Sequence, residues 1–415
     1  MARRSRVTVV TSGHLSTCPR MLKSADALAG AGYDVRMVAS RHEPWATVMD
    51  LEVRSRRAWP VDAVNYRRGD SGTTYWWTGV QHRVARAAIS AIGPARAPMP
   101  VVARAFGRVH AALVDAVCAQ PADFIYGGTT GALAAIAEAA RRSGTPYAVD
   151  FEDLHSAETS GAQAPLIDAL AARVEQDVIR GAAFLTTSSE AIASEYQRRY
   201  GVDPAVIHNT FPLPSRPPDF ARTNPSIFKA YWFSQTIGPG RGIEDAVVAL
   251  GRVGCAVEIT LLGRAQAGYL RAIRRLAKNN AFHVAVIHQP PAAPDAMVDF
   301  ARGYDVGLAL DYGSPLNREL CVTNKALTYI LAGVPVVMAD TLGQHALGVD
   351  LGRGAALVPG GDVDALAAAF AHWARNPAAL DCAKRTAWQR AANRWHWEHD
   401  AERGTLYRLV CGALS

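Results

Sequence analysis

Apolar residues along the chain follow two spacings, and their order predicts the architecture. Short apolar, β-branched runs such as RVTVV and AAFLTTS fit buried strands. The segments between them, such as MLKSADALAGAG, repeat apolar residues at helical spacing and end at glycine. Because strand and helix alternate, we expect an α/β fold with doubly wound parallel sheets and helices on both faces.

A proline-rich stretch interrupts this alternation once. HNTFPLPSRPPDFARTNP carries five prolines and fits an interdomain linker. Strand patterns resume beyond it in VEITLLG, HVAVIH and DVGLAL. We therefore expect one Rossmann-like domain over residues 1–212, a linker over 213–225 and a second Rossmann-like domain over 226–389.

Composition agrees with two globular domains. The 415 residues are 49% hydrophobic and 20% charged, which excludes a disordered or fibrous chain. The six cysteines form no CxxC pair and no zinc-ligand spacing, as expected for reduced thiols. The first apolar run is too short for a signal peptide, so we expect a cytoplasmic protein. The net charge of +7 favours anionic partners, and a phosphorylated substrate fits at least as well as nucleic acid, which we do not expect as a partner because the basic residues form no tight cluster.

Residues 60–120 do not follow the strand and helix rhythm. Within them, residues 75–108 combine Tyr75, Trp76 and Trp77 with five arginines on predicted helices. This composition is typical of helices that lie on anionic membranes, which would make the protein peripheral at the inner membrane face. The alternative is a pair of packing helices with solvated arginines, and both interpretations stay open.

The segment TNKALTYILAGVPVVM follows the strand DVGLAL and an irregular loop. Thr323 is the predicted N-cap of its helix, and Gly333 ends it. The helix start lies at the carboxyl edge of the sheet, where exposed amides attract phosphate, and Lys325 would add charge. A capped helix without a ligand is the alternative.

The turn SQTIGPGRG is predicted between the strand AYWF and the helix IEDAVVALG. Its glycines allow the backbone to approach a diphosphate, and the Arg241 guanidinium can grip two oxygens. An ordinary strand-to-helix connection is the alternative. The predicted diphosphate-binding residues are Ser234, Gln235, Gly238, Gly240, Arg241, Thr323, Asn324 and Lys325.

The string NKALTYILAGVPVV resembles the donor-site segment of GT-B glycosyltransferases, and it is most similar to glycosyltransferase family 4 (group 1). The stretches STCPRMLKSADALAGAGYDV, TTSSEAIASEYQRRYGV and GDVDALAAAF are similar to the same family. The resemblance spans the chain. It implies two Rossmann-like domains facing a cleft, with a C-terminal helix at about residues 390–415 crossing back to complete the first domain.

The resemblance implies transfer of a sugar from a nucleoside-diphosphate sugar to an acceptor hydroxyl, with retained configuration and without a metal or other cofactor. The donor belongs to the second domain, and the acceptor, which belongs to the first, can be a glycan, a lipid-linked sugar or a small molecule. Asp362 and Asp364 form a helix start rather than a metal site. Two alternatives stay open: a nucleotide-sugar-binding protein without transferase activity, and a nucleotide-sugar 2-epimerase.

The chain departs from the family pattern at the ribose end of the donor site. Thr328 stands where relatives usually carry a glutamate, and Leu320, next to Glu319, stands at a second glutamate position. A hydroxyl lacks the charge-assisted hydrogen bond of a carboxylate. The predicted nucleoside and sugar contacts are Gly263, His288, Gln289, Glu319, Leu320 and Thr328.

Polar residues also follow two strands of the first domain. VDFEDLHSAE ends a strand with the catalytic candidates Glu152, Asp153 and His155, and the resemblance places a functional histidine near Glu152. An acidic helix start with a solvated histidine is the alternative. Candidates for the acceptor or sugar side follow the first strand: Gly13, His14, Ser16, Thr17 and Arg20.

Overall fold

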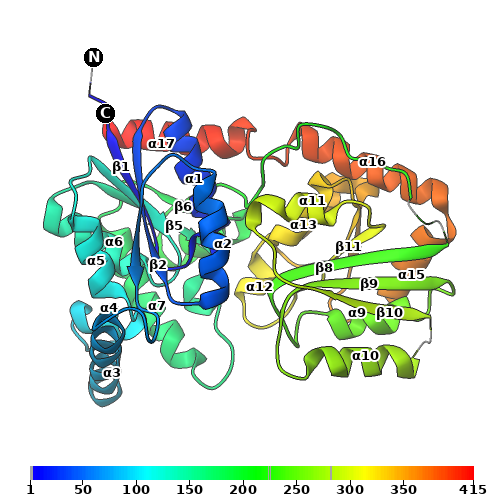
Figure 1. Cartoon of the computed structure of the whole chain (residues 1–415), viewed down its shortest axis with the longest axis horizontal. Helices are drawn as coiled ribbons and strands as arrows, with labels where there is room; N and C mark the ends of the chain where they lie inside the picture. Colours follow the sequence, from blue (N-terminus) through cyan, green and yellow to red (C-terminus); the bar gives the residue numbers. More distant parts are fainter. Residues whose placement is uncertain (1–2, 223, 225, 281–282) are drawn as a thin grey trace. The chain divides into compact units, whose positions relative to one another are not determined.

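The computed structural model describes residues 3–222, 224, 226–280 and 283–415. The chain forms two compact units (Figure 1). Met1–Ile207 and Arg403–Ser415 make up the first unit, and His208–Glu402 make up the second. Each unit is built on its own sheet, as the alternation of strand and helix patterns predicts.

Within the described residues, the first unit holds a seven-stranded sheet in the order β3-β2-β1-β4-β5-β6-β7. Every neighbouring pair of these strands is parallel. The strand order reverses direction between β1 and β4. The elements are β1 (Arg6–Thr11), α1 (Pro19–Gly30), β2 (Asp34–Arg41), α2 (Pro44–Ser55), β3 (Val61–Asn65), α3 (Thr74–Ile92), α4 (Met99–Phe106), α5 (His110–Cys118), β4 (Phe124–Gly128), α6 (Leu133–Ser143), β5 (Tyr147–Glu152), α7 (Ala164–Ile179), β6 (Leu185–Thr187), α8 (Glu190–Tyr200), β7 (Ala205–Val206) and α17 (Thr405–Leu414).

The second unit holds, among the residues described, a six-stranded parallel sheet in the order β10-β9-β8-β11-β12-β13. Here the order reverses between β8 and β11. Its elements are β8 (Ile227–Ile237), α9 (Ile243–Leu250), β9 (Ala256–Ala265), α10 (Tyr269–Asn280), β10 (Val284–Gln289), α11 (Met297–Ala301), β11 (Val306–Ala309), α12 (Asn317–Leu320), α13 (Asn324–Leu331), β12 (Val336–Ala339), α14 (His345–Leu351), β13 (Ala355–Val358), α15 (Val363–Arg375) and α16 (Pro377–Asn393).

Strand β8 shows why the apolar runs of this chain are nearly continuous. Tyr231 packs in one core cluster with residues of α13, and its neighbour Trp232 packs in another with residues of α9 and α15. Successive side chains of a strand point to opposite faces, so β8 is buried on both. Figure 1 shows α9 and α10 on one face of this sheet and α13 and α16 on the other. The predicted parallel sheet with two covered faces is confirmed.

The boundary between the units lies at different residues from those that the sequence pattern suggests. Part of the proline-rich stretch is tied to the chain that follows α16: Trp397 N donates to Phe211 O at 2.8 Å, and Leu213 N donates to a Glu398 carboxylate oxygen at 2.9 Å. Residues 208–212 and 390–402 therefore belong to the second unit, and the chain rejoins the first unit at Arg403. There Tyr407, on α17, donates to Ala27 O at 3.0 Å.

Residues 75–108 form α3, α4 and the connection between them, so their predicted helices are confirmed. No helix in the part of the chain that the structure describes is both long enough and apolar enough to cross a membrane.

Candidate functional site

The second unit brings the predicted phosphate-binding segments to one place on its sheet. The turn after β8 and the loop after β11 both leave the carboxyl edge where the strand order reverses. The crossovers from such neighbouring strands run to opposite faces of the sheet, so the strand ends between them stay accessible to a ligand. The side chains of Arg241 and Asp311 meet there.

The glycine-rich turn is shorter than the sequence pattern indicates. Strand β8 extends to Ile237, so Ser234 and Gln235 lie within the strand rather than in the turn. The pairing of β8 with β9 shifts register after Phe233 and then continues to Ile237. Gly263 of β9 makes this possible, because a Cβ there would lie 2.0 Å from Ser234 O.

The remaining glycines bring α9 against the end of β11. Gly242 is the N-cap of α9 and has φ +70°, and an added Cβ would lie 2.6 Å from Leu310 Cβ. Gly240 has φ +72°. Gly238 packs so closely on the Gln266 side chain that a Cβ would come within 2.7 Å. A side chain at Gly242 would push the turn away from the end of β11.

Asp311 joins the two predicted phosphate-binding cations. Its Oδ1 lies 3.2 Å from an Arg241 guanidinium nitrogen, and its Oδ2 lies 2.7 Å from Lys325 Nζ. The side chains of Asp311 and Lys325 are 6% and 9% exposed, whereas that of Arg241 is 36% exposed. Lys325 Nζ also lies 5.4 Å from the Trp232 ring centroid. Lys325 is therefore held in place, and Arg241 remains accessible.

The start of α13 has the predicted cap. The Thr323 side chain accepts a hydrogen bond from Lys325 N at 3.1 Å, and Asn324 begins the helix. Gly333, with φ +69°, follows the helix end. Both predictions for this helix are confirmed. Its first amides lie beside Lys325, so the positive end of the helix and a cation share one location.

Sequence patterns missed two residues of this cluster. Asp311 directly follows the apolar run DVGLAL. A polar residue in that place is expected at the carboxyl edge of the sheet, so the sequence contained a signal for it. Arg318, on α12, donates to Gly240 O at 2.8 Å and to Ser314 O at 3.0 Å. We call Arg241, Asp311, Arg318 and Lys325 the cation cluster. Arg241 and Lys325 pair with Asp311, and Arg318 adds a third positive charge, so the cluster favours a further anion.

The pKa shifts agree with this excess of positive charge. Burial opposes ionisation of Asp311, but Lys325 and Arg241 outweigh burial and hold its pKa below the ordinary value. Burial, followed by repulsion from Arg241, lowers the pKa of Arg318. An anion bound among these cations would relieve that repulsion.

The predicted nucleoside contacts fall into two groups. His288 on β10 reaches β9, where its Nε2 lies 2.9 Å from Gly263 O. The neighbouring Gln289 has a buried side-chain oxygen without a hydrogen-bond partner among the described residues. Thr328 is fully buried, and its hydroxyl donates to Asn324 O at 2.8 Å. Thr328 thus presents no accessible hydroxyl to a ribose in this arrangement.

Glu319 and Leu320 lie on the short helix α12. The Glu319 carboxylate accepts a hydrogen bond from Gly313 N, which fixes the loop after β11. Glu319 O accepts from Gly343 N at 2.8 Å, so backbone and side chain both brace neighbouring loops. The Leu320 side chain is 6% exposed. The carboxylate of Glu319 is the acidic group that lies nearest in sequence to the usual glutamate position.

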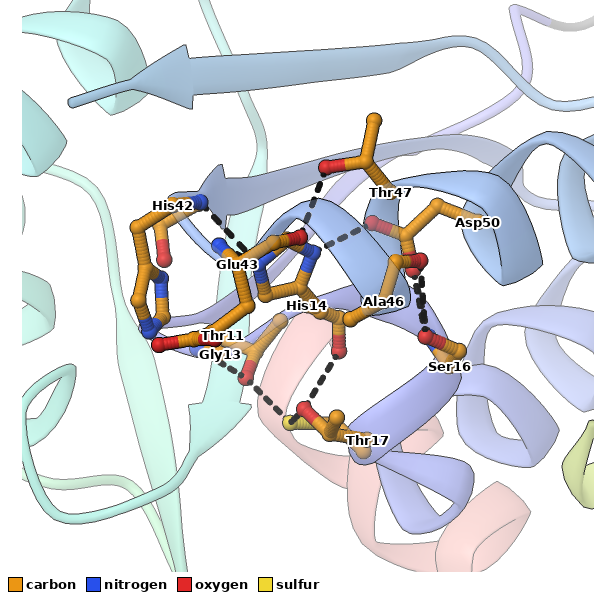
Figure 2. A network of polar contacts seen from close by, with 12 residues as sticks. Thr11, Gly13, His14, Ser16, Thr17, His42, Glu43, Ala46, Thr47 and Asp50 are labelled. Carbon is orange, nitrogen blue, oxygen red and sulfur yellow. Dashed lines mark hydrogen bonds and ion pairs between the residues drawn. The ribbon is translucent and has the colours of Figure 1, made fainter. Parts of the chain in front are cut away.

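His14 of the first unit lies at the centre of a local polar network (Figure 2). Its Nε2 accepts hydrogen bonds from His42 N at 3.0 Å and Glu43 N at 2.8 Å. Its Nδ1 therefore carries the proton and donates to Asp50, at 2.7 Å. Asp50 also accepts from the Ser16 hydroxyl at 2.7 Å. The loop after β1 is thus fastened to α2, and both His14 nitrogens are used.

Arg20 is also buried. Its guanidinium pairs with Asp150 on β5 and donates to Thr187 O at 3.1 Å, and its side chain is 3% exposed. Thr17 donates to His14 O at 3.1 Å, and a Cβ at Gly13 would lie 2.6 Å from the Cys18 sulfur. Four residues predicted for the acceptor or sugar side, His14, Ser16, Thr17 and Arg20, have structural partners here.

The strand end at β5 gathers the three catalytic candidates. Glu152 has a positive φ of 44°, a conformation that non-glycine residues rarely adopt outside strained sites. Tyr196 donates to Asp153 O at 3.4 Å. His155 Nδ1 lies 3.0 Å from Glu158, and Thr130 donates to the same carboxylate at 2.8 Å. His155 is buried rather than solvated, so the solvated alternative is excluded for it.

The described residues contain no group of three or more His, Cys, Asp or Glu side chains placed to hold a metal ion. Asp362 is the N-cap of α15, where it accepts from Ala365 N at 2.9 Å, as predicted for this pair of aspartates.

Solved structures with the same two-unit fold are known. Anabaena HepE, solved in complex with UDP and glucose, aligns over 99% of both chains with a TM-score of 0.66 and 16% identity. Sucrose-phosphate synthase from Thermosynechococcus elongatus aligns over 99% of this chain and 100% of its own, with a TM-score of 0.64 and 16% identity. A putative UDP-N-acetylglucosamine 2-epimerase from Listeria monocytogenes covers 98% and 96%, with a TM-score of 0.55 and 12% identity. These likenesses establish the GT-B fold.

A family model matches one part of the chain. The glycosyl transferase 4-like domain matches residues 19–210. Residues 19–210 resemble glycosyltransferase family 4, and the whole chain has the GT-B fold. No curated protein matches the chain. The matched domain lies in the first unit, except for its last three residues, and the cation cluster lies in the second.

The ion pair of His155 with Glu158 predicts that the stability of the protein depends on pH. Burial opposes the charged imidazole, but Glu158 outweighs burial and raises the pKa of His155 to about 9 from its ordinary 6.5. A raised pKa stabilises the folded state fully below pH 6.5, and this contribution is lost as the pH rises through about 9. We expect the unfolding free energies of wild type and His155→Gln to converge between these pH values. Parallel curves in urea titrations would contradict the ion pair.

Proposed function

We propose that the protein transfers a sugar from a nucleoside-diphosphate sugar to an acceptor hydroxyl, with the donor diphosphate held by the cation cluster. The observation that carries this proposal is that Arg241 and Lys325 pair with Asp311 at the edge where the strand order reverses, while Arg318 holds the turn at Gly240. A diphosphate needs several positive groups, and the positive end of α13 lies beside Lys325 in this cluster. HepE, of the same fold, was solved with UDP-glucose.

The proposed chemistry is a displacement at the anomeric carbon with retained configuration. The acceptor oxygen forms a bond to the anomeric carbon as the bond between that carbon and the β-phosphate oxygen breaks. The proton of the acceptor hydroxyl passes to the departing diphosphate. Arg241 and Lys325 stabilise the negative charge that develops on the leaving group, so no metal ion is required for this role.

We propose that the first unit binds the acceptor, through the residues that follow β1 and β5. Glu152, Asp153 and His155 are the candidates for contact with the reacting groups. Gln289 and His288 are the candidates for the nucleoside, because an unpartnered buried amide oxygen suits the edge of a base. The six cysteines are unpaired, which fits a cytoplasmic location.

Product analysis separates this proposal from its alternatives. The protein is incubated with each nucleotide sugar, alone and with extracted glycan and lipid acceptors, and the products are identified by mass spectrometry and NMR. Transfer predicts a glycosylated acceptor and release of nucleoside diphosphate. Conversion of the donor into an isomer without an acceptor would identify a 2-epimerase, since a putative enzyme of that class has the same fold as this chain. Tight donor binding without any product would identify a binding protein.

A further inference from the structure

Helix α3 exposes its apolar side chains. Trp76 and Trp77 are 60% and 62% exposed, and Val80 and Val84 are 42% and 64% exposed. Their spacing of three to four residues places them on one side of the helix. We call these four residues the apolar stripe. A surface helix ordinarily turns such a stripe toward the core, so this orientation needs a reason.

Polar contacts fix α3 in this orientation. His82 Nδ1 lies 2.9 Å from Arg104 O, and Thr78 is buried. Arg108 donates to Tyr75 O at 2.9 Å, and its guanidinium carbon lies 4.4 Å from the Tyr75 ring centroid. Figure 1 shows α3 beside α4 in the first unit. The inner side of the helix is therefore anchored by hydrogen bonds, and the apolar stripe is left outside.

The stretch of chain that carries the stripe has charges of a single sign. No aspartate or glutamate occurs in the sequence between Asp70 and Asp115. The same stretch contains five arginines, at positions 83, 86, 96, 104 and 108. Arg83 is exposed within the stripe itself. A positive surface without internal counter-charges attracts an extended anionic surface.

We infer that the apolar stripe of α3 docks on an anionic lipid bilayer. The indole rings of Trp76 and Trp77 are amphipathic and suit the headgroup region, where Val80 and Val84 gain apolar contact. Arg83 would pair with lipid phosphate. A second copy of the chain is a poorer occupant, because a symmetric contact would bring two positive stripes together.

Vesicle co-sedimentation tests this inference without any sugar substrate, so its outcome is independent of the transfer reaction. The full chain is mixed with vesicles of phosphatidylcholine alone or of phosphatidylcholine with phosphatidylglycerol. We expect binding to the anionic vesicles that weakens as salt is raised. The double variant W76A/W77A should lower the partition coefficient by about tenfold or more.

Two further variants make the result specific. R83E should weaken anionic binding while keeping the stripe apolar. The control L342A/V349A removes side chains that are 72% and 63% exposed on the second unit, and it should bind as wild type does. Equal unfolding midpoints establish that the variants fold. The inference would be overturned if the wild-type protein did not bind anionic vesicles, or if L342A/V349A lowered binding as much as W76A/W77A does. Self-association of the wild type that depends on concentration and is abolished by W76A/W77A would also overturn it.

Discussion

Arg241→Ala should lower kcat about a hundredfold, because it removes one of the cations that stabilise the departing diphosphate. The Arg241 side chain is 36% exposed, so its loss should leave the unfolding midpoint nearly unchanged. Arg241→Lys should recover part of the activity, since it restores a positive charge without the two-pronged geometry. Initial rates of nucleoside diphosphate release measure the effect.

Arg252→Ala is the matched control for this variant. Arg252 is also an arginine of the second unit and pairs with an aspartate, but its partner Asp364 is 91% exposed at the start of α15. Its loss should change kcat by less than twofold, because surface ion pairs contribute little. Similar losses for both variants would indicate a general effect of net charge. Normal turnover of Arg241→Ala would remove the cation cluster from the reaction.

The second large effect concerns stability. Arg20→Ala should lower the free energy of unfolding of the first unit by about 3–5 kcal/mol, because it leaves the Asp150 carboxylate buried without its partner. Asp150 is 0% exposed, and its remaining hydrogen-bond donors, the Thr186 hydroxyl and Glu152 N, carry no charge. Urea denaturation followed by circular dichroism measures the change.

Arg141→Ala provides the comparison on the surface of the same unit. Arg141 is 55% exposed and pairs with Asp177 at 3.1 Å, so its removal should cost less than about 1 kcal/mol. The double variant Arg20→Ala/Asp150→Ala should be more stable than the sum of the single changes predicts, because it removes both charges. Additive single effects would mean that the two side chains do not stabilise each other.

Sequence patterns are sufficient for the fold because apolar runs and helical spacing depend on neighbouring residues. They predicted two parallel sheets, the Thr323 cap and the end of α13 at Gly333, and the structure has all of these. They placed the start of the turn after β8 too early. The continuation of β8 depends on Gly263, which is close in space but 29 residues from Ser234.

The direction of individual side chains could not be predicted. Arg20 and His14 follow the first strand. Their place in the sequence does not show whether their side chains point toward a ligand or into the protein. Their partners, Asp150 and Asp50, are 130 and 36 residues away in the sequence, so no local pattern reveals them. Asp311 was missed for a related reason, because its importance comes from the two cations that it joins.

Binding of a nucleoside diphosphate to the second unit tests the central claim most directly. Thermal unfolding of the full chain is followed with UDP, GDP, TDP or ADP, for wild type and Arg241→Ala. A ligand at about a hundred times its Kd stabilises the native state by about 2.7 kcal/mol, so one nucleotide should raise the wild-type midpoint by a few degrees. The shift should shrink in Arg241→Ala. If no nucleotide raises the wild-type midpoint, the cation cluster is not a donor site.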